Sequence, residues 1–457
     1  MAALEFSAAE KEEAVSLLQS LIRIDTTNPP GNEREAIELV ENRCQSMGLE
    51  TVLVGTSRER PNLVARWPAG AHRKCERPLI LSCHLDVVPA NPEQWTHPPL
   101  SGFDDGTCIW GRGAIDMKGF AAMGLSALSR LRKEQTPINR DLIFVAVCDE
   151  EAGTRHGSKW LVDNHADLLG ENPEYVINEV GGFTVHQKGR RFYPVQVAEK
   201  GVAWIRMTVK GTSGHSSLPS DDNAVVHLGK AIEAIGRTRL PWHPSEEASR
   251  FIAGFAGPDG AAARALSPLL SHPVIGPRLL PLAVTDPSRR KSLEAILRNT
   301  ANPTVLKTGN PINVIPSTAS VDIDGRLAPG QNAADLIREL QNITARIPGV
   351  DAKFEILEES PAVSFSPDTP LFEEIERGLR EADPEAHVIP SIIQGFTDSK
   401  NYARLGAICY GFYPLQLPEE IDFASLFHGI DERIPITGFH WGIKTLTQVL
   451  QKFLTKS

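Results

Sequence analysis

A mostly apolar stretch at 78–84 ends in His84, and Asp86 follows two residues later; both side chains can take part in metal binding. The stretch has the length and composition of a buried β-strand. Side chains at positions i and i+2 of a strand project from one face, so the imidazole and the carboxylate can act together. In open α/β sheets, ligands bind outside the carboxyl ends of the strands. The pair is either a metal ligand with a helper or a strand terminus that faces water.

Further carboxylates and a second imidazole follow other expected strands and loops. They are Asp116 at the end of the glycine-punctuated loop "GRGAID", Glu150 and Glu151 after the strand at 141–148, Glu179 before two glycines in "YVINEVGG", and His428 in "SLFHGIDERI". Taken singly, each of these residues is weak evidence for a functional site. Paired glutamates, for example, usually lie on a solvated face of a protein. The carboxyl ends of parallel strands share one edge of a sheet, so we expect these side chains to meet there.

Two imidazoles and three carboxylates suit a pair of zinc ions, because zinc accepts nitrogen and oxygen ligands at about 2.0–2.2 Å. Two-metal sites hold their ions about 3.5–4 Å apart and trap a hydroxide between them. Of two adjacent glutamates, one can bind metal while its neighbour takes a proton from that water. We expect Asp86 to accept the second ring N–H of His84 and to fix its tautomer. Cobalt or manganese would fit the same donors.

The elements that must position these residues alternate between helix and strand. We expect helices at 7–23, 32–48 and 117–133 and strands near 62–67, 78–84 and 141–148. This alternation indicates an α/β domain with a mostly parallel, helix-covered sheet. After about residue 363 the same pattern returns, with "LGAICYGFYP" as another buried strand.

A different pattern begins at "EKGVAWIRMTVK", where apolar residues alternate with period two along 202–209. Two further strands, "SVDIDGRLAP" and "AKFEILEES", and helices at 223–236 and 332–346 indicate a small α/β sandwich with one exposed sheet face. We expect the proline-rich stretch 241–303 to be irregular. The sequence therefore predicts an inserted domain, 200–361, between two parts of a larger domain, 1–199 and 362–457.

Composition excludes several classes of protein. The chain has 457 residues, of which 41% are hydrophobic and 23% charged, as in a globular protein of more than one domain. Its net charge of −10 gives no reason to expect nucleic acid or an anionic membrane as partner. No apolar run approaches the roughly 20 residues of a membrane span, and the start lacks a basic leader. Six cysteines without a C-x-x-C pair favour a reduced, cytoplasmic setting.

Six motifs, in chain order, carry a resemblance. The stretches are "CHLDVVP", "GRGAIDMKG", "CDEEAGTRHG", "NEVGG", "GHSSLPS" and "FHGIDERI". Together they resemble the dinuclear zinc exopeptidase and amidohydrolase family, which includes acetylornithine deacetylase, succinyl-diaminopimelate desuccinylase, aminoacylase and glutamate carboxypeptidases. The resemblance spans nearly the whole chain.

The resemblance implies two Zn²⁺ ions per subunit and assigns the residues of the first domain. It places His84 and Glu179 on one ion, Glu151 and His428 on the other, and Asp116 between both. It makes Glu150 the general base and Asp86 the aspartate that orients His84. It also implies a cis peptide bond between Asp116 and Met117.

The inserted domain corresponds in this family to a lid that also forms a homodimer contact. His215 in "TSGHSS" matches a lid histidine that reaches the partner subunit's site and polarises the scissile carbonyl. Asn313 and Arg326 match positions that face the substrate, and the arginine suits a free carboxylate. The loop "QGFTDSKNYARLG" departs from the family, because Phe396 replaces its second glycine. We expect "VAWIRMTVK" to be an exposed sheet edge that pairs with a second copy.

The length of stretch 241–303 resembles the larger carboxypeptidase and N-acyl-amino-acid hydrolase branch. We therefore expect hydrolysis of a small peptide or N-acyl amino acid beside a free carboxylate. One alternative is a catalytically idle metal-binding interaction protein, but Glu150 beside Glu151 argues against it, since binding alone needs no base. A nucleotide-binding protein is the other, but the glycines of "GRGAIDMKG" lack both the G-x-G-x-x-G spacing and a P-loop lysine.

Overall fold

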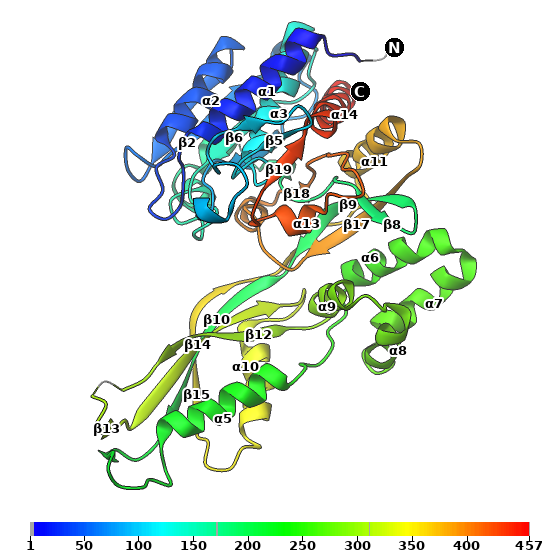
Figure 1. Cartoon of the computed structure of the whole chain (residues 1–457). Helices are drawn as coiled ribbons and strands as arrows, with labels where there is room; N and C mark the ends of the chain where they lie inside the picture. The colour runs from blue at the N-terminus through cyan, green and yellow to red at the C-terminus, as the bar shows by residue number, and fades with distance from the viewer. Residues whose placement is uncertain (1–3, 171, 310, 457) are drawn as a thin grey trace. The chain divides into compact units, whose positions relative to one another are not determined.

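The computed structural model describes residues 4–170, 172–309 and 311–456 (Figure 1). The chain divides into two compact units. The first unit consists of Met1–Val197, Phe365–Pro390 and Thr397–Ser457, and the second consists of Ala198–Ser364 and Ser391–Phe396. The first unit is therefore assembled from three separate pieces of chain.

The first unit contains a helix-covered sheet. Its helices are α1 (Ala8–Arg23), α2 (Arg34–Ser46), α3 (Lys118–Lys133), α4 (Ser158–Asn164), α11 (Pro370–Ala382), α12 (Ser399–Tyr402), α13 (Phe423–Leu426) and α14 (Ile436–Thr455). Its strands are β1 (Glu50–Gly55), β2 (Pro61–Trp67), β3 (Leu79–His84), β4 (Phe103–Asp104), β5 (Cys108–Trp110), β6 (Leu142–Val147), β7 (Tyr175–Asn178), β8 (Val185–Gln187), β18 (Ile408–Gly411) and β19 (Arg433–Pro435). Strands β9 (Arg190–Glu199) and β17 (Ala386–Ile393) each continue into the second unit.

The main sheet has the order β1-β2-β6-β3-β7-β18-β9, and the four strands from β6 to β18 run parallel. The strands that flank this parallel core, β2 and β9, pair with it in the antiparallel direction. The predicted α/β fold is confirmed, with its parallel part confined to the four central strands. Because β3, β6 and β7 are parallel, their carboxyl ends lie at one edge of the sheet.

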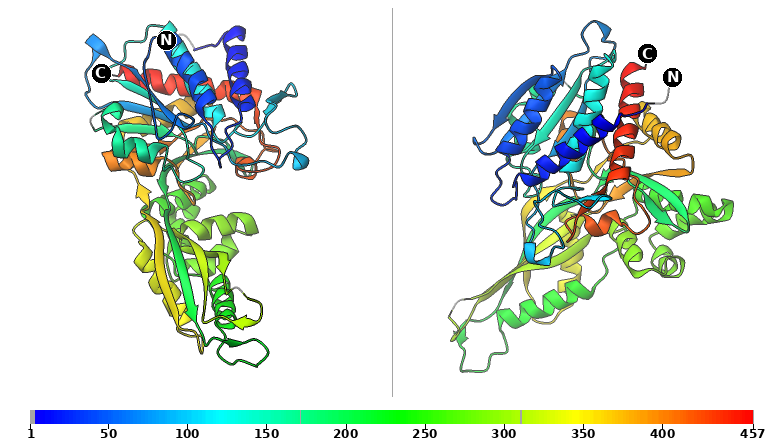
Figure 2. Two further views of the ribbon diagram at one scale, coloured as in Figure 1. Left: turned by 90° about the vertical axis from the view of Figure 1, so that its left-hand side faces the viewer. Right: turned by 45° about the horizontal axis from the view of Figure 1, so that its top comes forward.

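Helices bury both faces of this sheet, as the fully buried residues of β3 require. On one face, Leu81 lies against Gly124 of α3, and Figures 1 and 2 show α1, α2 and α14 grouped with that helix. The next residue back, Ile80, points to the other face and joins a buried cluster with Leu161 of α4. The period of two along a strand thus places neighbouring apolar residues in two separate cores.

The second unit combines a four-stranded antiparallel sheet with helices. Its strands are β10 (Gly201–Lys210), β11 (Gly214–His215), β12 (Thr300–Lys307), β13 (Val314–Ile315), β14 (Thr318–Leu327), β15 (Ala352–Ser360) and β16 (Val363–Ser364). Its helices are α5 (Ala224–Arg237), α6 (Glu246–Ala256), α7 (Ala261–Ser271), α8 (Gly276–Ala283), α9 (Pro287–Ile296) and α10 (Ala333–Thr344). Helices α5 and α10 cover one sheet face, where Ile205, Met207 and Val209 of β10 are buried in the core of the unit.

The expected position of β10 in its sheet is wrong. The order is β12-β14-β10-β15, so β10 pairs with a neighbour on each side and is a central strand. The alternation along 202–209 correctly separated the two faces of the strand. Ile205, Met207 and Val209 are buried, and Trp204 on the other face is 38% exposed. Alternation of apolar residues distinguishes the two faces of a strand, but it does not show whether the strand is central or at the edge of its sheet. The edge strands here are β12 and β15.

The expectation of an irregular stretch at 241–303 is also wrong. Helices α6 to α9 occupy most of it, followed by β12. Pro277 and Pro287 fit these helices because each stands in a first turn, where the missing N–H has no intrahelical partner. Pro268 and Pro281 instead lie inside α7 and α8. Pro287 starts α9 after the cap residue Asp286, whose side chain accepts from the Arg289 N–H at 2.7 Å.

None of the described helices combines the length and apolar composition that a membrane span requires. The six cysteines are free, and five of them are buried.

Candidate metal centre

The predicted residues of the first unit meet at the carboxyl edge of its parallel strands. His84 is the last residue of β3 and stands in register with Val147, the last residue of β6. Glu150 and Glu151 follow β6 after two residues, and Glu179 directly follows β7. The sheet thus brings an imidazole and three carboxylates together from three adjacent strands.

A sharp turn presents Glu179. The next residue, Val180, has φ of 59°, and Gly181 and Gly182 follow with φ of 136° and 77°. A Cβ atom at Gly181 would lie 2.3 Å from the main-chain oxygen of Gly411, so no side chain fits there. The two glycines allow the chain to reverse close to the sheet, which leaves the carboxylate at the strand end.

A second carboxylate, that of Glu432, holds the loop that carries Asp116. It accepts hydrogen bonds from the main-chain N–H groups of Ile115 and Asp116 at 2.7 and 3.0 Å, and from Arg112 at 2.7 Å. Glu432 is fully buried. The sequence analysis missed it, although it lies four residues after His428 in a motif that was recognised. The peptide bond between Asp116 and Met117 is cis, as predicted.

The Asp116 carboxylate lies between the two histidines. One oxygen, Oδ1, is 3.1 Å from Nε2 of His84, and the other, Oδ2, is 2.9 Å from Nε2 of His428. Glu179 lies on the His84 side at 3.5 Å, and Glu151 lies on the His428 side at 3.0 Å. Each histidine therefore has one glutamate of its own and shares the aspartate with the other.

Asp86 organises the strand ends behind this cluster. Nδ1 of His84 lies 3.0 Å from the main-chain oxygen of Asp86 and 3.5 Å from its carboxylate. The carboxylate accepts from the N–H groups of Glu150 and Glu151, both at 3.1 Å, and from the Asn28 side chain at 2.9 Å. Asp86 thus fixes the main chain of both glutamates as well as facing the imidazole.

Asn28 connects the site to a buried ionic network that the sequence analysis also missed. Its amide bridges Asp86 and Asp149, the latter at 3.1 Å. Arg60 pairs with Asp149 at 3.0 Å and with the buried Glu33 at 2.8 Å. These residues come from segments far apart in the sequence, so no local pattern links them.

The crowding of carboxylates changes their acidity. Burial, together with the charge of Glu179, raises the pKa of Glu150 well above its ordinary value. Burial also raises the pKa of Glu151 to about 7 and that of Glu179 to about 8. Hydrogen bonds to Asp116 and Glu151 raise the pKa of His428 to about 10. The protein without bound cations therefore favours extra protons at these groups, because so many negative charges are enclosed together.

The donor set fits divalent cations. Two groups of donor atoms, each within 4.8 Å, share His84: one adds Glu150 and Glu179, and the other adds Asp116 and Glu151. Oε1 of Glu150 and Oε1 of Glu151 are buried and have no hydrogen-bond partner among the described residues. Buried acceptors of this kind call for a partner, and imidazole with carboxylate suits zinc and related ions.

The other predicted residues, His215, Asn313 and Arg326, belong to the second unit. His215 lies at the end of β11 and is exposed, with its Nδ1 2.8 Å from Oγ of Ser217. Asn313 is also exposed, and its main-chain oxygen accepts from Ser216. Arg326 on β14 donates through Nε to Asp324 at 3.1 Å, and its guanidinium lies 5.4 Å from the ring centre of Phe396.

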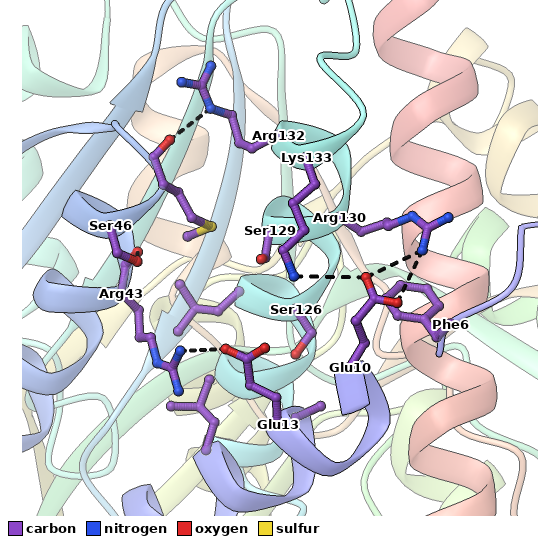
Figure 3. Close-up of a pocket in the computed structure, with 14 residues that line it drawn as sticks. Phe6, Glu10, Glu13, Arg43, Ser46, Ser126, Ser129, Arg130, Arg132 and Lys133 are labelled. Atoms are coloured by element: carbon purple, nitrogen blue, oxygen red, sulfur yellow. Dashed lines mark hydrogen bonds and ion pairs between the residues drawn. The ribbon is translucent and has the colours of Figure 1, made fainter. Parts of the chain in front are cut away.

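A cavity of about 380 Å³ lies elsewhere in the first unit, between α1, α2 and α3 (Figure 3). Its acids are ion-paired: Glu10 with Arg130 at 3.2 Å and Glu13 with Arg43 at 2.6 Å. No histidine or cysteine is among the described residues that line it. The cavity therefore lacks the histidines of the cluster around Asp116, and its own carboxylates pair with arginines. The cluster around Asp116 is the better candidate for a metal site.

This donor set makes the cluster at the edge of the α/β sheet a candidate site for divalent cations. Residues 80–452 match the family described as Peptidase family M20/M25/M40. The chain belongs to this family, which confirms the resemblance predicted from the six motifs.

Relatives in the family carry several activities in their names. The chain is 29% identical over 378 residues to a probable carboxypeptidase S-like 2 of Dictyostelium discoideum, covering 79% of this chain and 69% of the relative. It is 27% identical over 448 residues to the aminoacylase-1 of Homo sapiens, covering 96% and 95%. Among solved structures, the M20 family metallo-carboxypeptidase Sso-CP2 of Sulfolobus solfataricus matches with a TM-score of 0.71 at 19% identity, over 96% of this chain and 99% of that one. That structural likeness shows the shared fold.

Proposed function

We propose that the chain hydrolyses a peptide or N-acyl amide bond next to a free carboxylate, with two divalent cations as cofactors. The observation that carries this proposal is the Asp116 carboxylate, which directs one oxygen to each of two histidines. A carboxylate in that position is suited to bridge two metal ions. The names of the relatives, carboxypeptidase and aminoacylase, support the substrate class.

We propose the same ligand sets as the resemblance implied. His84 and Glu179 would hold one ion, Glu151 and His428 would hold the other, and Asp116 would serve both sets. The distances of 3.5 Å between His84 and Glu179 and 3.0 Å between His428 and Glu151 support this division. Zinc is the proposed metal, and cobalt and manganese suit the same donors. When bound, such ions act as Lewis acids and lower the pKa of a water molecule.

Glu150 is the proposed general base. Its main chain is fixed by Asp86, and its buried Oε1 has no partner among the described residues. It takes a proton from the attacking water as the new C–O bond forms. It then delivers that proton to the leaving nitrogen as the C–N bond breaks, so the products are a carboxylic acid and an amine.

The second unit supplies the proposed substrate contacts. Arg326 binds the free carboxylate of the substrate, because its planar guanidinium can donate two parallel hydrogen bonds. Asn313 contacts the same substrate. His215 polarises the scissile carbonyl in the site of a second copy of the chain, and its exposure in its own unit supports that role.

These roles imply an assembly and a setting. We propose a homodimer that forms through the inserted domain, 200–361, with the catalytic domain made of 1–199 and 362–457. Free cysteines support a reducing, cytoplasmic environment. The alternative of an idle metal-binding protein is disfavoured by Glu150, for which pure binding has no use.

A hydrolysis screen tests the proposal directly. Protein freed of metal would be reloaded with zinc, cobalt or manganese and offered dipeptides and N-acyl amino acids, with product amines measured. We expect release of an amino acid from at least one class, and only after metal is restored. Esters that block the substrate carboxylate serve as controls and should react far more slowly. Absence of hydrolysis across both classes with metal bound would leave the binding-protein alternative.

A further inference from the structure

A cluster of buried polar side chains adjoins the candidate metal centre, and no step of the proposed hydrolysis uses it. Its members belong to the first unit and are each at most 4% exposed. They come from three segments far apart in the sequence: Thr154 with Ser158, then Asn178, and finally Thr397, Asp398, Ser399 and Asn401. Polar groups removed from water need partners, so the contacts of this cluster show what it holds in place.

One set of contacts is a directional chain of hydrogen bonds through Ser158. The Asn401 amide donates to Oγ of Ser158 at 2.7 Å, and the Ser158 hydroxyl donates its single proton to Oδ1 of Asp398. A hydroxyl that gives its proton to a carboxylate keeps its lone pairs free to accept, so the direction of both bonds is fixed. The same amide also donates to Oγ1 of Thr154 at 3.0 Å. The segment 397–401 therefore holds Thr154 through Asn401.

Thr154 ends the turn that carries Glu150 and Glu151. Its φ of 65° lies in the left-handed region, which a β-branched residue adopts only under constraint. Its main-chain N–H donates to the oxygen of Asp149 at 2.6 Å, which closes the turn. The hydrogen bond from Asn401 adds to this constraint and thereby helps to fix the path of the chain after Glu151.

The same segment also contacts the end of β7. Asn178 is the last residue of that strand and stands directly before Glu179. Its amide donates to Oγ1 of Thr397 at 3.3 Å and to Oγ of Ser399 at 3.5 Å. Oγ1 of Thr397 is itself held, because it accepts from the Ser399 N–H at 3.1 Å. One short segment, 397–401, thus reaches both strand ends on which the glutamates of the metal centre stand.

We propose that the segment 397–401 is a positioning element, which fixes the turn carrying Glu150 and Glu151 relative to the strand end carrying Glu179. The inference rests on the proposed function, because it assigns the segment a role in orienting the groups that hold the cations and move the proton. Hydrogen bonds behind a metal site orient its ligands, and their loss commonly lowers metal affinity or activity by about 10–100-fold. The segment acts through the glutamates and holds no cation itself.

Paired substitutions of threonine test the proposal. Thr154→Val keeps the branching of the side chain and removes the hydroxyl that accepts from Asn401. We expect its affinity for Zn²⁺, measured on the metal-freed full chain by competition with a chromophoric chelator, to fall about tenfold. Thr154→Ser restores the hydroxyl and should restore the affinity. Thr397→Val and Thr397→Ser form a second pair with the same expected outcome, which tests the contact to β7 separately.

The matched control is Thr447→Val on α14, which removes a buried hydroxyl that donates to the Ile443 oxygen at 2.6 Å. Thermal unfolding of the metal-free proteins measures how much stability each variant loses. Thr447→Val should leave Zn²⁺ affinity unchanged even where its loss of stability equals that of Thr154→Val. An equal loss of Zn²⁺ affinity in Thr447→Val would overturn the proposal, because the effect would then follow stability alone.

The remaining outcomes separate this proposal from the proposed function. Wild-type Zn²⁺ affinity in either valine variant would overturn the positioning role, as would equal losses in the valine and serine variants of one pair. A wild-type chain that binds Zn²⁺ and hydrolyses none of the offered substrates would refute the proposed function, while the affinities of the variants would still decide the positioning role. A wild-type chain without affinity for Zn²⁺ would overturn both.

Discussion

Most of the proposed metal ligands in the first unit are buried, whereas two of the proposed substrate-contacting residues in the second unit are exposed. In the first unit the side chains of His84, Asp116 and Glu179 are 1%, 2% and 4% exposed, and each is held by neighbouring groups. In the second unit His215 and Asn313 stand on the surface. Enclosure fixes the geometry of the groups that we propose to hold cations and strengthens their electrostatic interactions. Groups that meet a substrate or another subunit must instead stay accessible.

Loss of a proposed metal ligand should give the largest effect on metal content and hydrolysis. It tests whether the buried residues of the first unit bind metal. His84→Ala removes a proposed ligand of one ion, and Asp116→Ala removes the carboxylate that lies between the two histidines. We therefore expect both variants to have a lower content of divalent metal and to lose nearly all hydrolysis. Elemental analysis of the purified variants measures the metal. His72→Ala, at an exposed position, is the control and should retain full content. Full occupancy in both His84 and Asp116 variants would remove these residues from the ligand set.

Replacement of the proposed base should separate chemistry from metal binding. Glu150→Gln keeps the shape of the side chain and removes the proton acceptor, so turnover should fall by about 10²–10⁴-fold. Metal content should stay near that of the wild type. The exposed Glu93→Gln is the matched control. Turnover close to the wild-type rate would show that Glu150 takes no part in proton transfer.

The proposed role of the exposed His215 can be tested by mixing subunits of two inactive variants. His215→Ala should retain metal and lose activity, and Glu150→Gln should do the same. After subunit exchange at equal amounts, about half of the dimers are mixed, and each mixed dimer has one site with both residues intact. Activity should therefore recover to about a quarter of the wild-type value. If exchange is demonstrated and activity stays absent, His215 serves its own subunit or no site at all.

The smallest expected effect concerns recognition of the substrate carboxylate. Arg326→Lys keeps the charge and loses the planar pair of donors, so KM should rise about tenfold while kcat changes little. Arg338→Lys, on a side chain that is 68% exposed, is the control. The difference between the wild type and Arg326→Lys should vanish for substrates whose carboxylate is esterified. An unchanged KM for the free acid would exclude Arg326 from this contact.

The strand ends of the first unit were predictable, because their signal is local. Each of His84, Glu150 and Glu179 follows a short apolar run, and parallel strands bring such ends to one edge. Glu432 and Asn28 were not predictable in the same way. Their roles depend on hydrogen bonds to Asp116 and Asp86 across long stretches of chain, and neither residue interrupts an apolar pattern.

The errors in the second unit have equally specific physical causes. The alternation along β10 depends on which face is buried, and a central strand shows the same period as an edge strand. Prolines suggested an irregular stretch at 241–303, although residues such as Ser245 and Asp286 are good helix caps that precede α6 and α9. A closer reading of the caps would have predicted these two helix starts.

The division of the first unit into three pieces has a consequence for the order of synthesis. The ribosome delivers Asp116, Glu151 and Glu179 early, but His428 follows only after roughly 250 further residues, or about 12–50 s at ordinary translation rates. During that interval the carboxylates have one histidine between them instead of two. We therefore expect tight metal capture to begin only once the last segment has left the ribosome. Chains arrested before and after residue 428 has emerged, compared for metal retention, would measure that delay.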